Sequence, residues 1–288
     1  MNEIKNTRTI NDLTSKCTIL VNSCDIYSDV WELFFASVRQ NWKNCPFEFV
    51  LNTESKQFEM EDINLRVSNC DGDNTWGRRF RNALKSIDTP YVLPILEDFV
   101  LTDKVDESII YKIMEWMDKE KDISVFYIYN HPYVIKEKTK YDKFGLLPQN
   151  CPYRLTTAIG VWRTEMLYSY IKDMESPWEW EMYGSIRARR FKTKMFALLS
   201  KDDEVFKFPY GGVIRRGLWH TETPEIADKY GTNIDFTKRG FMDPNNPYRD
   251  NDLYSVRHHF PKDVFKAVFW KTTLERIKLY ARVLRIIL

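Results

Sequence analysis

Short runs of β-branched and other apolar residues alternate along this chain with segments whose apolar side chains recur every three or four positions. The strand-like runs cover residues 18–21, 47–51, 91–96, 123–129 and 194–199. The helix-like segments between them cover residues 31–42, 76–87 and 105–117. Strands that alternate with helices predict an α/β layered fold with a mainly parallel sheet, because parallel neighbours are joined by long crossovers that are usually helical.

Length and charge limit both the architecture and the class of partner. The chain has 288 residues, of which 43% are hydrophobic and 29% charged, so it can bury a large core as one domain or one domain with appendages. Its 43 basic and 41 acidic residues leave a net charge of only +2. That balance argues against a protein that coats nucleic acid.

Cysteine usage and hydropathy bear on the compartment. The five cysteines are scattered and include no C-x-x-C pair, so neither a disulfide framework nor a thiolate zinc site is predicted. Residues 1–16 lack the apolar core of a secretory signal, and no apolar run has the length needed to cross a bilayer. We therefore expect a protein that stays in the cytoplasm.

The second half of the chain is less regular. A helix is expected around residues 166–174, and a second, aromatic and acidic one begins at Pro177. Further along, Thr223 has the features of an N-cap, and Gly231 stands where a left-handed residue commonly ends a helix. A short helix is predicted between these two residues.

Two adjacent acids, Glu97 and Asp98, directly follow the apolar strand at 91–96. Open α/β sheets bind ligands at the carboxyl ends of their strands, and carboxylates there are suitable ligands for Mg²⁺ or Mn²⁺. Taken alone, the dipeptide is better explained as a turn before the next helix. Its surroundings favour a ligand site.

The segment Tyr91 to Thr102, YVLPILEDFVLT, resembles the part of GT-A glycosyltransferases in which a strand ends in a D-x-D acidic motif. Asp98 matches the final metal-binding acid, Glu97 stands in the middle place, and Leu96 replaces the first acid. The order of segments over residues 18–240 is also similar to that family in bacterial surface polysaccharide synthesis. The resemblance implies a GT-A-like sheet with flanking helices and a Mn²⁺ or Mg²⁺ cofactor.

The same resemblance implies a set of residues that bind the nucleotide-sugar donor. Asn22, Ser23 and Asp25 would face the nucleotide, with Glu97 nearby. The ribose and diphosphate would be bordered by Asp73, Trp76 and Arg79 in the segment DGDNTWGRRF. For each residue alone, a surface loop or a core tryptophan explains the sequence equally well.

The segment Glu175 to Ser185, ESPWEWEMYGS, is similar to the acceptor segment of polysaccharide glycosyltransferases, in which a carboxylate is the catalytic base. Glu181 and Glu179 are the candidates, and Trp178 and Trp180 would form a platform for the acceptor sugar. On a helix that begins at Pro177, Glu181 shares a face with Trp178, so Glu181 is preferred. The alternative is a solvated helix with buried tryptophans.

A third segment, Tyr210 to Trp219, resembles the stretch that closes such catalytic domains. By that likeness, Arg215 or Arg216 would bind the phosphate oxygens of the departing diphosphate. The alternative is a basic β-turn without a ligand.

The predicted domain covers residues 1–240, and an extension covers 241–288. From residue 264 onward, one apolar stripe faces a row of basic residues, which predicts a basic amphipathic helix. Such a helix can lie on an anionic membrane. Docking on the protein's own core or in a homodimer interface is nearly as good an explanation.

These observations lead to one functional hypothesis and two alternatives. The chain would transfer a sugar from a nucleotide-diphosphate sugar, with a UDP-sugar expected, to a lipid-linked saccharide at the inner face of the membrane, with inversion. One alternative is a non-catalytic nucleotide-binding or membrane-associated protein with the same fold. A nucleotidyltransferase is disfavoured because no glycine-rich basic loop follows the first strand.

Overall fold

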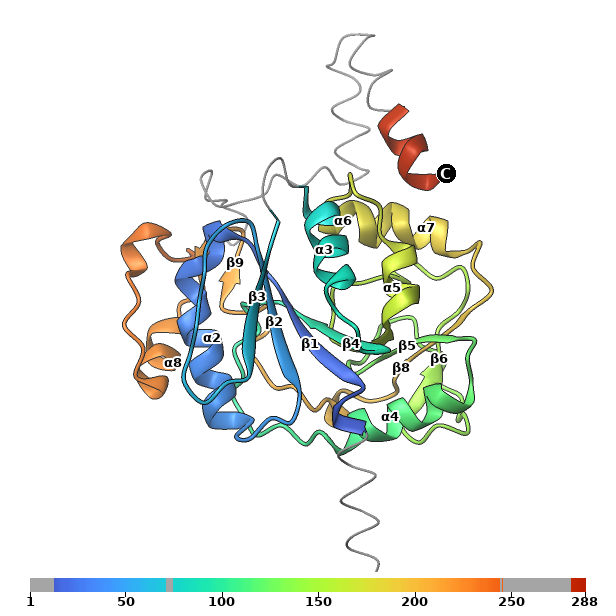
Figure 1. Ribbon diagram of the computed structural model, residues 1–288, viewed down its shortest axis with the longest axis horizontal. Helices are drawn as coiled ribbons and strands as arrows, with labels where there is room; N and C mark the ends of the chain where they lie inside the picture. Colours follow the sequence, from blue (N-terminus) through green and yellow to red (C-terminus); the bar gives the residue numbers. More distant parts are fainter. Residues whose placement is uncertain (1–12, 71–74, 244, 246–280) are drawn as a thin grey trace, which may run out of the picture.

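A mixed eight-stranded sheet organises the chain (Figure 1). The computed structural model describes residues 13–70, 75–243, 245 and 281–288. The strands of the sheet are β1 (Cys17–Asn22), β2 (Glu48–Thr53), β3 (Leu65–Asn69), β4 (Tyr91–Ile95), β5 (Ile123–Tyr127), β6 (Phe144–Leu146), β7 (Gly160–Arg163) and β8 (Lys194–Leu198). Their order is β3-β2-β1-β4-β7-β5-β8-β6.

Most neighbouring strands are parallel, which confirms the predicted α/β class. β1 pairs in parallel with β2 and β4, β2 with β3, and β5 with β8. β7 is the exception inside the sheet, because it is antiparallel to both β4 and β5. In the parallel half, Asn22 lies opposite Asn52, and Val21 opposite Ile95. The carboxyl ends of β1, β2 and β4 therefore meet at one edge.

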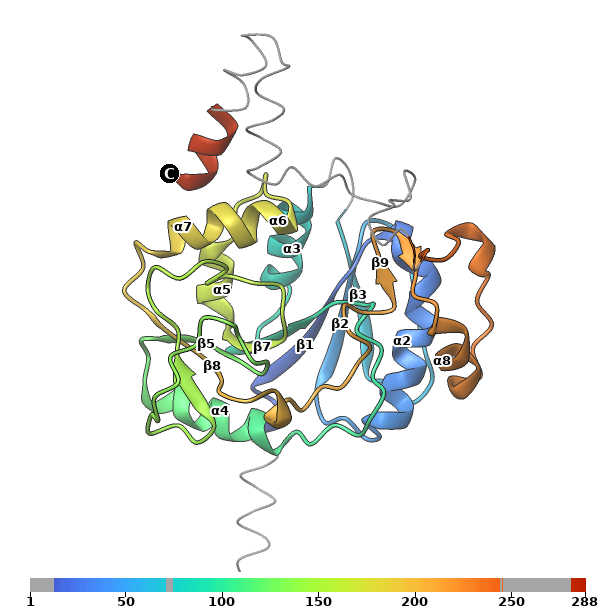
Figure 2. The same ribbon diagram turned by 180° about the vertical axis from the view of Figure 1, so that it is seen from behind.

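Helices cover both faces of the sheet (Figures 1 and 2). The longer ones are α2 (Ser28–Asn41), α3 (Trp76–Lys85), α4 (Ser108–Lys119), α5 (Thr164–Tyr170) and α8 (Thr223–Tyr230). Alternate residues of β1 point to opposite faces: Ile19 and Val21 join the core with α2 and α4, whereas Leu20 joins the core with α3 and α5. The sheet is buried on both sides, as its continuous apolar strands require.

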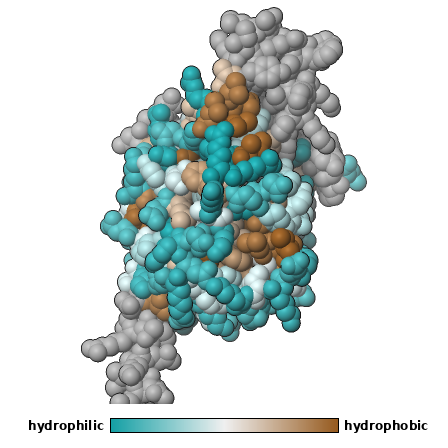
Figure 3. Space-filling model, turned by 90° about the vertical axis from the view of Figure 1, so that its right-hand side faces the viewer, coloured by the Kyte–Doolittle hydropathy of each residue, from teal (hydrophilic) through white to brown (hydrophobic). Residues whose placement is uncertain are grey.

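Several short elements complete the fold. They are the 3₁₀ turns η1 (Asp25–Tyr27), η3 (Lys201–Asp203) and η4 (Phe236–Lys238), the helical turns α6 (Pro177–Glu179) and α7 (Ser185–Ala188), the π-helical turn η2 (Trp180–Gly184) and the hairpin strands β9 (Ile214–Arg215) and β10 (Leu218–Trp219). The side of the molecule that carries β6 and α7 is mainly hydrophilic, with apolar side chains in small patches (Figure 3).

Most predicted elements are present, with three differences. α5 ends at Tyr170 rather than near residue 174, because Ile171 is already extended. The N-cap of α8 is Glu222, and the hydroxyl of Thr223 instead donates to the Val213 carbonyl at 3.2 Å. Gly231 does end α8 in the left-handed conformation, with φ of +66°. β3, β6 and β7 were not predicted.

The predicted extension at 241–288 falls mostly outside the described residues, which include only 241–243, 245 and 281–288 of it. Residues 281–287 are helical. Most of the predicted amphipathic stripe thus lies outside the described part of the chain. Within that part, no helix combines the length and the apolar character that a bilayer crossing requires.

Gly77, in the first turn of α3, allows this helix to approach the segment before α6. Its N–H donates to the Glu175 carbonyl at 2.9 Å, and a Cβ at Gly77 would overlap the Lys172 carbonyl oxygen.

We predict that Gly77→Ala lowers the free energy of unfolding by about 1–3 kcal/mol, because α3 must move away. Urea unfolding measures this change. Lys85→Ala, at an exposed position of α3, is the control and should stay within about 0.5 kcal/mol of wild type; equal losses for both variants would contradict the explanation.

Candidate functional site

A cleft of about 780 Å³ opens at the carboxyl ends of β1 and β4. Most of the residues predicted for a site line it: Asn22, Ser23, Trp76, Arg79, Glu97, Asp98, Trp178, Glu181, Arg215 and Arg216. They come from segments up to 194 positions apart, counted from Asn22 to Arg216. The position agrees with the general rule for ligand sites in open α/β sheets.

Glu97 and Asp98 place two carboxyl groups side by side in a poorly hydrated part of this cleft. Glu97 is only 6% exposed. Burial raises the pKa of Glu97 to about 7, although a hydrogen bond with Ser23 and the nearby Arg239 and Arg79 oppose the rise. Burial, together with the charge of Glu97, also raises the pKa of Asp98. The two groups resist being ionised together unless a cation joins them.

The loop before β9 packs directly on Asp98. The Val213 N–H donates to the Asp98 carbonyl at 2.9 Å. Gly212 has φ of +79°, and a Cβ at this position would overlap the Asp98 carboxylate. A residue without a side chain is therefore needed here both for the backbone conformation and for the space that the carboxylate occupies.

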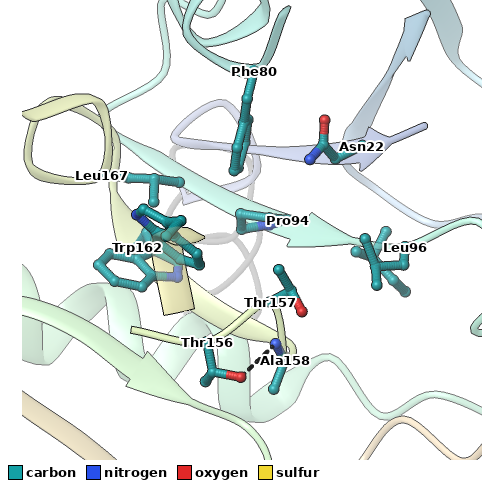
Figure 4. A pocket seen from close by; sticks show the side chains of 11 residues that line it. Asn22, Phe80, Pro94, Leu96, Thr156, Thr157, Ala158, Trp162 and Leu167 are labelled. Carbon is teal, nitrogen blue, oxygen red and sulfur yellow. Dashed lines mark hydrogen bonds between the residues drawn. The ribbon is translucent and has the colours of Figure 1, made fainter. Parts of the chain in front are cut away.

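The last residue of β1 and the residue after it are held by short polar contacts. The Asn52 amide donates to Asn22 Oδ1 at 2.6 Å, and the Trp31 indole donates to Ser23 Oγ at 2.7 Å. Asn22 also borders a small hollow of about 10 Å³, which is close to the lower limit for holding one water, beside the cleft. Figure 4 shows Asn22, Pro94, Leu96 and Thr157 around this hollow.

Asp25, predicted to face the nucleotide, has a different position. Its carboxylate accepts the backbone N–H groups of Glu54, Ser55 and Lys56 at 3.1–3.2 Å. Burial alone would raise the pKa of Asp25, but these bonds and the Ser55 hydroxyl lower it. Asp25 is not among the residues that line the cleft; it ties the loop after β1 to the loop after β2. Asp73, the other predicted acid, lies outside the described residues.

The α3 residues Trp76 and Arg79 form one wall of the cleft. Arg79 Nη1 donates to Glu54 Oε1 at 2.7 Å, so part of its charge is already balanced. The ring of Trp76 packs edge-on against Phe80, with the ring centres 5.1 Å apart. Both side chains are thus fixed by protein contacts while they border the open space.

Glu181 stands on the π-helical turn η2, a type of turn that is rare and often found at functional sites. Its Oε1 accepts three hydrogen bonds: from the Thr157 N–H at 2.7 Å, the Thr157 hydroxyl at 2.8 Å and the Thr156 hydroxyl at 3.1 Å. No hydrogen bond among the described residues uses Oε2. One oxygen therefore orients the group, while the other is available to a ligand in the cleft.

Glu179, the alternative candidate for a base, is occupied by structural contacts. It completes a capping box with Ser176, whose N–H donates to Glu179 Oε2 at 2.9 Å. Arg282 donates to both of its carboxylate oxygens, at 2.8 and 2.9 Å. Burial would raise the pKa of Glu179, but the contacts with Arg282 and Ser176 lower it. A carboxylate with these partners does not fit the role of a base.

The two predicted platform tryptophans are separated. Trp178 lines the cleft. Trp180 is 2% exposed, its indole N–H donates to the Tyr170 carbonyl at 3.2 Å, and its ring lies beside those of Trp76 and Trp162. Trp180 is therefore a core residue, and the expectation that it contacts an acceptor does not fit its position.

Arg215 and Arg216 belong to a tight hairpin between β9 and β10. Arg216 and Gly217 both have positive φ angles, of 53° and 76°, as a two-residue type I′ turn requires. Both arginines line the cleft. The two arginines therefore form a basic β-turn, and this turn is also part of the cleft wall.

Several residues that shape this site were not predicted. Arg239 is buried, holds Asp29 through two 2.7 Å bonds and lies 4.4 Å from the centre of the Tyr27 ring. Thr156 and Thr157 orient Glu181, and Arg282 reaches the cleft from the end of the chain. Nothing in the sequence near these residues indicates their distant partners.

The cleft offers few ligands for a metal ion. No group of three or more His, Cys, Asp or Glu residues suited to a metal occurs among the described residues. The pair Glu97–Asp98 supplies carboxylate oxygens only, which fits Mg²⁺ or Mn²⁺ bound by one or two carboxylates plus substrate phosphates. It does not fit a metal that needs nitrogen or sulfur ligands.

Comparisons with known proteins give distant structural likeness. No family model matches the sequence, and no curated protein matches it. The solved S. aureus TarS 1–349 is 16% identical, with a TM-score of 0.44 over 65% of this chain and 58% of that one. TarS 1–349 in complex with UDP-GlcNAc is 12% identical, with a TM-score of 0.43 over 78% of this chain and 69% of that one.

A third solved structure is of another kind. CMP:2-keto-3-deoxy-manno-octonic acid synthetase complexed with CTP is 11% identical, with a TM-score of 0.37 over 64% of this chain and 89% of that one. At such values these likenesses establish neither a family nor a role for any residue.

The raised pKa of Glu97 predicts a pH dependence of stability. Between the ordinary pKa of 4.5 and the folded value of about 7, the folded state binds a proton that the unfolded state has lost. Glu97 therefore contributes stability below pH 4.5 that is lost as the pH rises through 7, by at most about 3–4 kcal/mol. We expect Glu97→Gln to flatten this slope in urea unfolding between pH 5 and 8. Glu225→Gln, on the exposed part of α8, is the control; an unchanged slope in Glu97→Gln would contradict the prediction.

Proposed function

We propose that this protein is a glycosyltransferase that moves a sugar from a nucleotide-diphosphate sugar to the hydroxyl of a saccharide acceptor. The observation that supports the proposal best is that Glu97 and Asp98 line the same cleft as Glu181. The first two carboxyl groups suit a cation beside a diphosphate. The third is oriented by the two threonines and keeps one oxygen for chemistry.

The half of the cleft beside β1 and β4 would bind the donor. Asn22 and Ser23 border the nucleotide, and Trp76 and Arg79 form the adjoining wall. Asp98, with Glu97 beside it, would hold Mn²⁺ or Mg²⁺, which supplies positive charge to the diphosphate. Arg215 and Arg216 add fixed positive charge where the departing diphosphate gains negative charge. A UDP-sugar is the proposed donor.

The half beside α6 and η2 would bind the acceptor. Trp178 offers an aromatic face to a sugar ring. Glu181 Oε2 takes the proton of the acceptor hydroxyl as that oxygen forms a bond to the anomeric carbon, and the bond from this carbon to the diphosphate breaks. Attack on the face opposite the leaving group inverts the anomeric centre. A lipid-linked saccharide at the inner membrane surface remains the proposed acceptor.

A nucleotidyltransferase is the second candidate, since it would use the same kind of sheet and cation. The segment from the last residue of β1 to the end of η1, residues 22–27, reads NSCDIY and contains neither glycine nor a basic residue. Such a loop gives little support to the triphosphate of a nucleotide. Release of pyrophosphate from CTP, without sugar transfer, would favour this candidate over the proposal.

The proposal predicts separate effects for the two halves of the cleft. On a panel of nucleotide sugars with Mn²⁺, we expect Glu181→Gln to lower the turnover rate about 10²- to 10⁴-fold, because proton removal from the acceptor is lost. Donor binding, measured by thermal shift, should be unchanged. Asp98→Ala should lose the Mn²⁺-dependent part of donor binding. Glu32→Gln, exposed on α2, is the control.

Full turnover by Asp98→Ala or Glu181→Gln would reject the assigned roles. Binding of nucleotide sugars without either transfer or hydrolysis by the wild-type protein would instead support a non-catalytic nucleotide-binding protein.

Gly211 and Gly212 allow the proposed cation site to be tested by a binding measurement, without an activity assay. Gly211 and Gly212 have φ angles of +80° and +79°, but only a Cβ at Gly212 would overlap the Asp98 carboxylate, whereas nothing lies within 4 Å of one at Gly211. We predict that Gly212→Ala weakens Mn²⁺-dependent UDP binding about 10- to 100-fold, measured by calorimetry. Gly211→Ala carries the same backbone strain and is the control. Equal losses in both variants would mean that strain alone is responsible.

A further inference from the structure

Residues 281–288 pack against the part of the chain that carries Glu181. Figures 1 and 2 place this short helical segment next to α6 and α7. α6, η2 and α7 follow one another without a break from Pro177 to Ala188. The segment contacts this stretch on both sides of the π-helical turn.

The first contact lies immediately before the turn. Arg282 Nε and Nη2 donate to the two oxygens of Glu179 at 2.8 and 2.9 Å, and Nη2 also donates to the Met174 carbonyl at 3.2 Å. The Glu179 side chain is 16% exposed and that of Arg282 is 51% exposed. This two-bond geometry fixes the orientation of both groups.

The second contact lies after the turn. Ile286 is fully buried, and its carbonyl accepts a hydrogen bond from Arg187 Nη1. Arg187 is itself fixed, because it donates to both oxygens of the buried Glu175 at 2.6 and 3.0 Å, and to the Tyr170 carbonyl. The segment is therefore anchored to a buried ion pair as well as to the rim of the cleft.

The π-helical turn η2, which lies between these contacts, needs support to keep its geometry. A π-helical turn holds one more residue than the α-helical one and is rare. Glu181 is the second residue of η2, and its position decides whether Oε1 reaches Thr156 and Thr157. A shift of η2 to α-helical geometry would change the rotation of residues on one side of the turn relative to the other, and with it the position of Glu181 relative to these donors.

We propose that residues 281–288 act as a splint that holds η2 in its π-helical form and thereby positions the Glu181 carboxylate toward the cleft. The role of Glu181 as the base rests on the proposed function, whereas the positioning of its carboxylate does not. Arg282 and Ile286 are positioning residues, because they act on the site through Glu179 and Arg187.

Hydrogen exchange of the Thr157 amide in the full-length protein tests the splint, since this N–H donates directly to Glu181. Ile286→Asp should release the segment, because a charge cannot remain in the buried position, and should accelerate Thr157 exchange about ten-fold or more. Arg282→Ala should accelerate it about two- to five-fold. Amides of β1 and β4 should keep their wild-type rates.

Matched controls come from the same segment. Leu284 is 56% exposed and Arg285 is exposed, so Leu284→Asp and Arg285→Ala make the same chemical changes without loss of a described contact. In a Glu181→Ala background, Ile286→Asp should have no further effect on Thr157, because the acceptor is already gone.

Two results would overturn the splint. One is an unchanged Thr157 rate in Ile286→Asp, and the other is an equal acceleration in Leu284→Asp. Neither result depends on a sugar-transfer assay, so failure of the splint and failure of the proposed glycosyltransferase activity can be told apart.

Discussion

The site depends on two carboxyl groups that the fold holds next to each other, away from water, at the end of β4. Removal of a carboxylate from water costs several kcal/mol unless it is paired, neutralised or bound to a cation. The surrounding residues reduce that cost without removing it: Arg239 is close enough to lower both pKa values but is already committed to Asp29. The local structure thus favours either a bound proton or a bound cation, and under the proposed function the diphosphate would supply further oxygens to that cation.

Two structurally different parts of the chain build the two halves of the cleft. The residues beside Asp98 follow the parallel strands β1, β2 and β4, whose common direction brings three strand ends together. Glu181 and the threonines that hold it come from the part around β7, which runs antiparallel to its neighbours. Because β7 is reversed, the loop that precedes it, with Thr156 and Thr157, reaches the same edge of the sheet as the loops that follow β1 and β4.

This division explains what could be predicted from the sequence. Regular parallel strands and helices leave periodic patterns, so the segments 18–21 and 91–96 and the acid pair after them were identified. β7 is a four-residue strand without such a pattern, and no local signal links Thr157 to Glu181 or Arg239 to Asp29. Within the segment 175–185, the S-x-x-E spacing of Ser176 and Glu179 is a local signature of the capping box. The contact of Glu179 with Arg282, which lies 103 positions away, has no such local signal.

Three departures from regular geometry lie beside the cleft. Gly212 with positive φ, the Arg216–Gly217 turn and the π-helical turn each bring a backbone or a charged group closer to the cleft than regular structure allows. The left-handed Arg216 and the π-helical turn cost conformational energy that surrounding contacts must offset, whereas glycine adopts positive φ at no steric cost. The Val213 bond to the Asp98 carbonyl holds the loop at Gly212, and the two anchors from residues 281–288 hold η2. A left-handed Arg216 and a π-helical turn beside the same cleft are the kind of strained geometry that clusters at ligand sites, and this supports a ligand in the cleft.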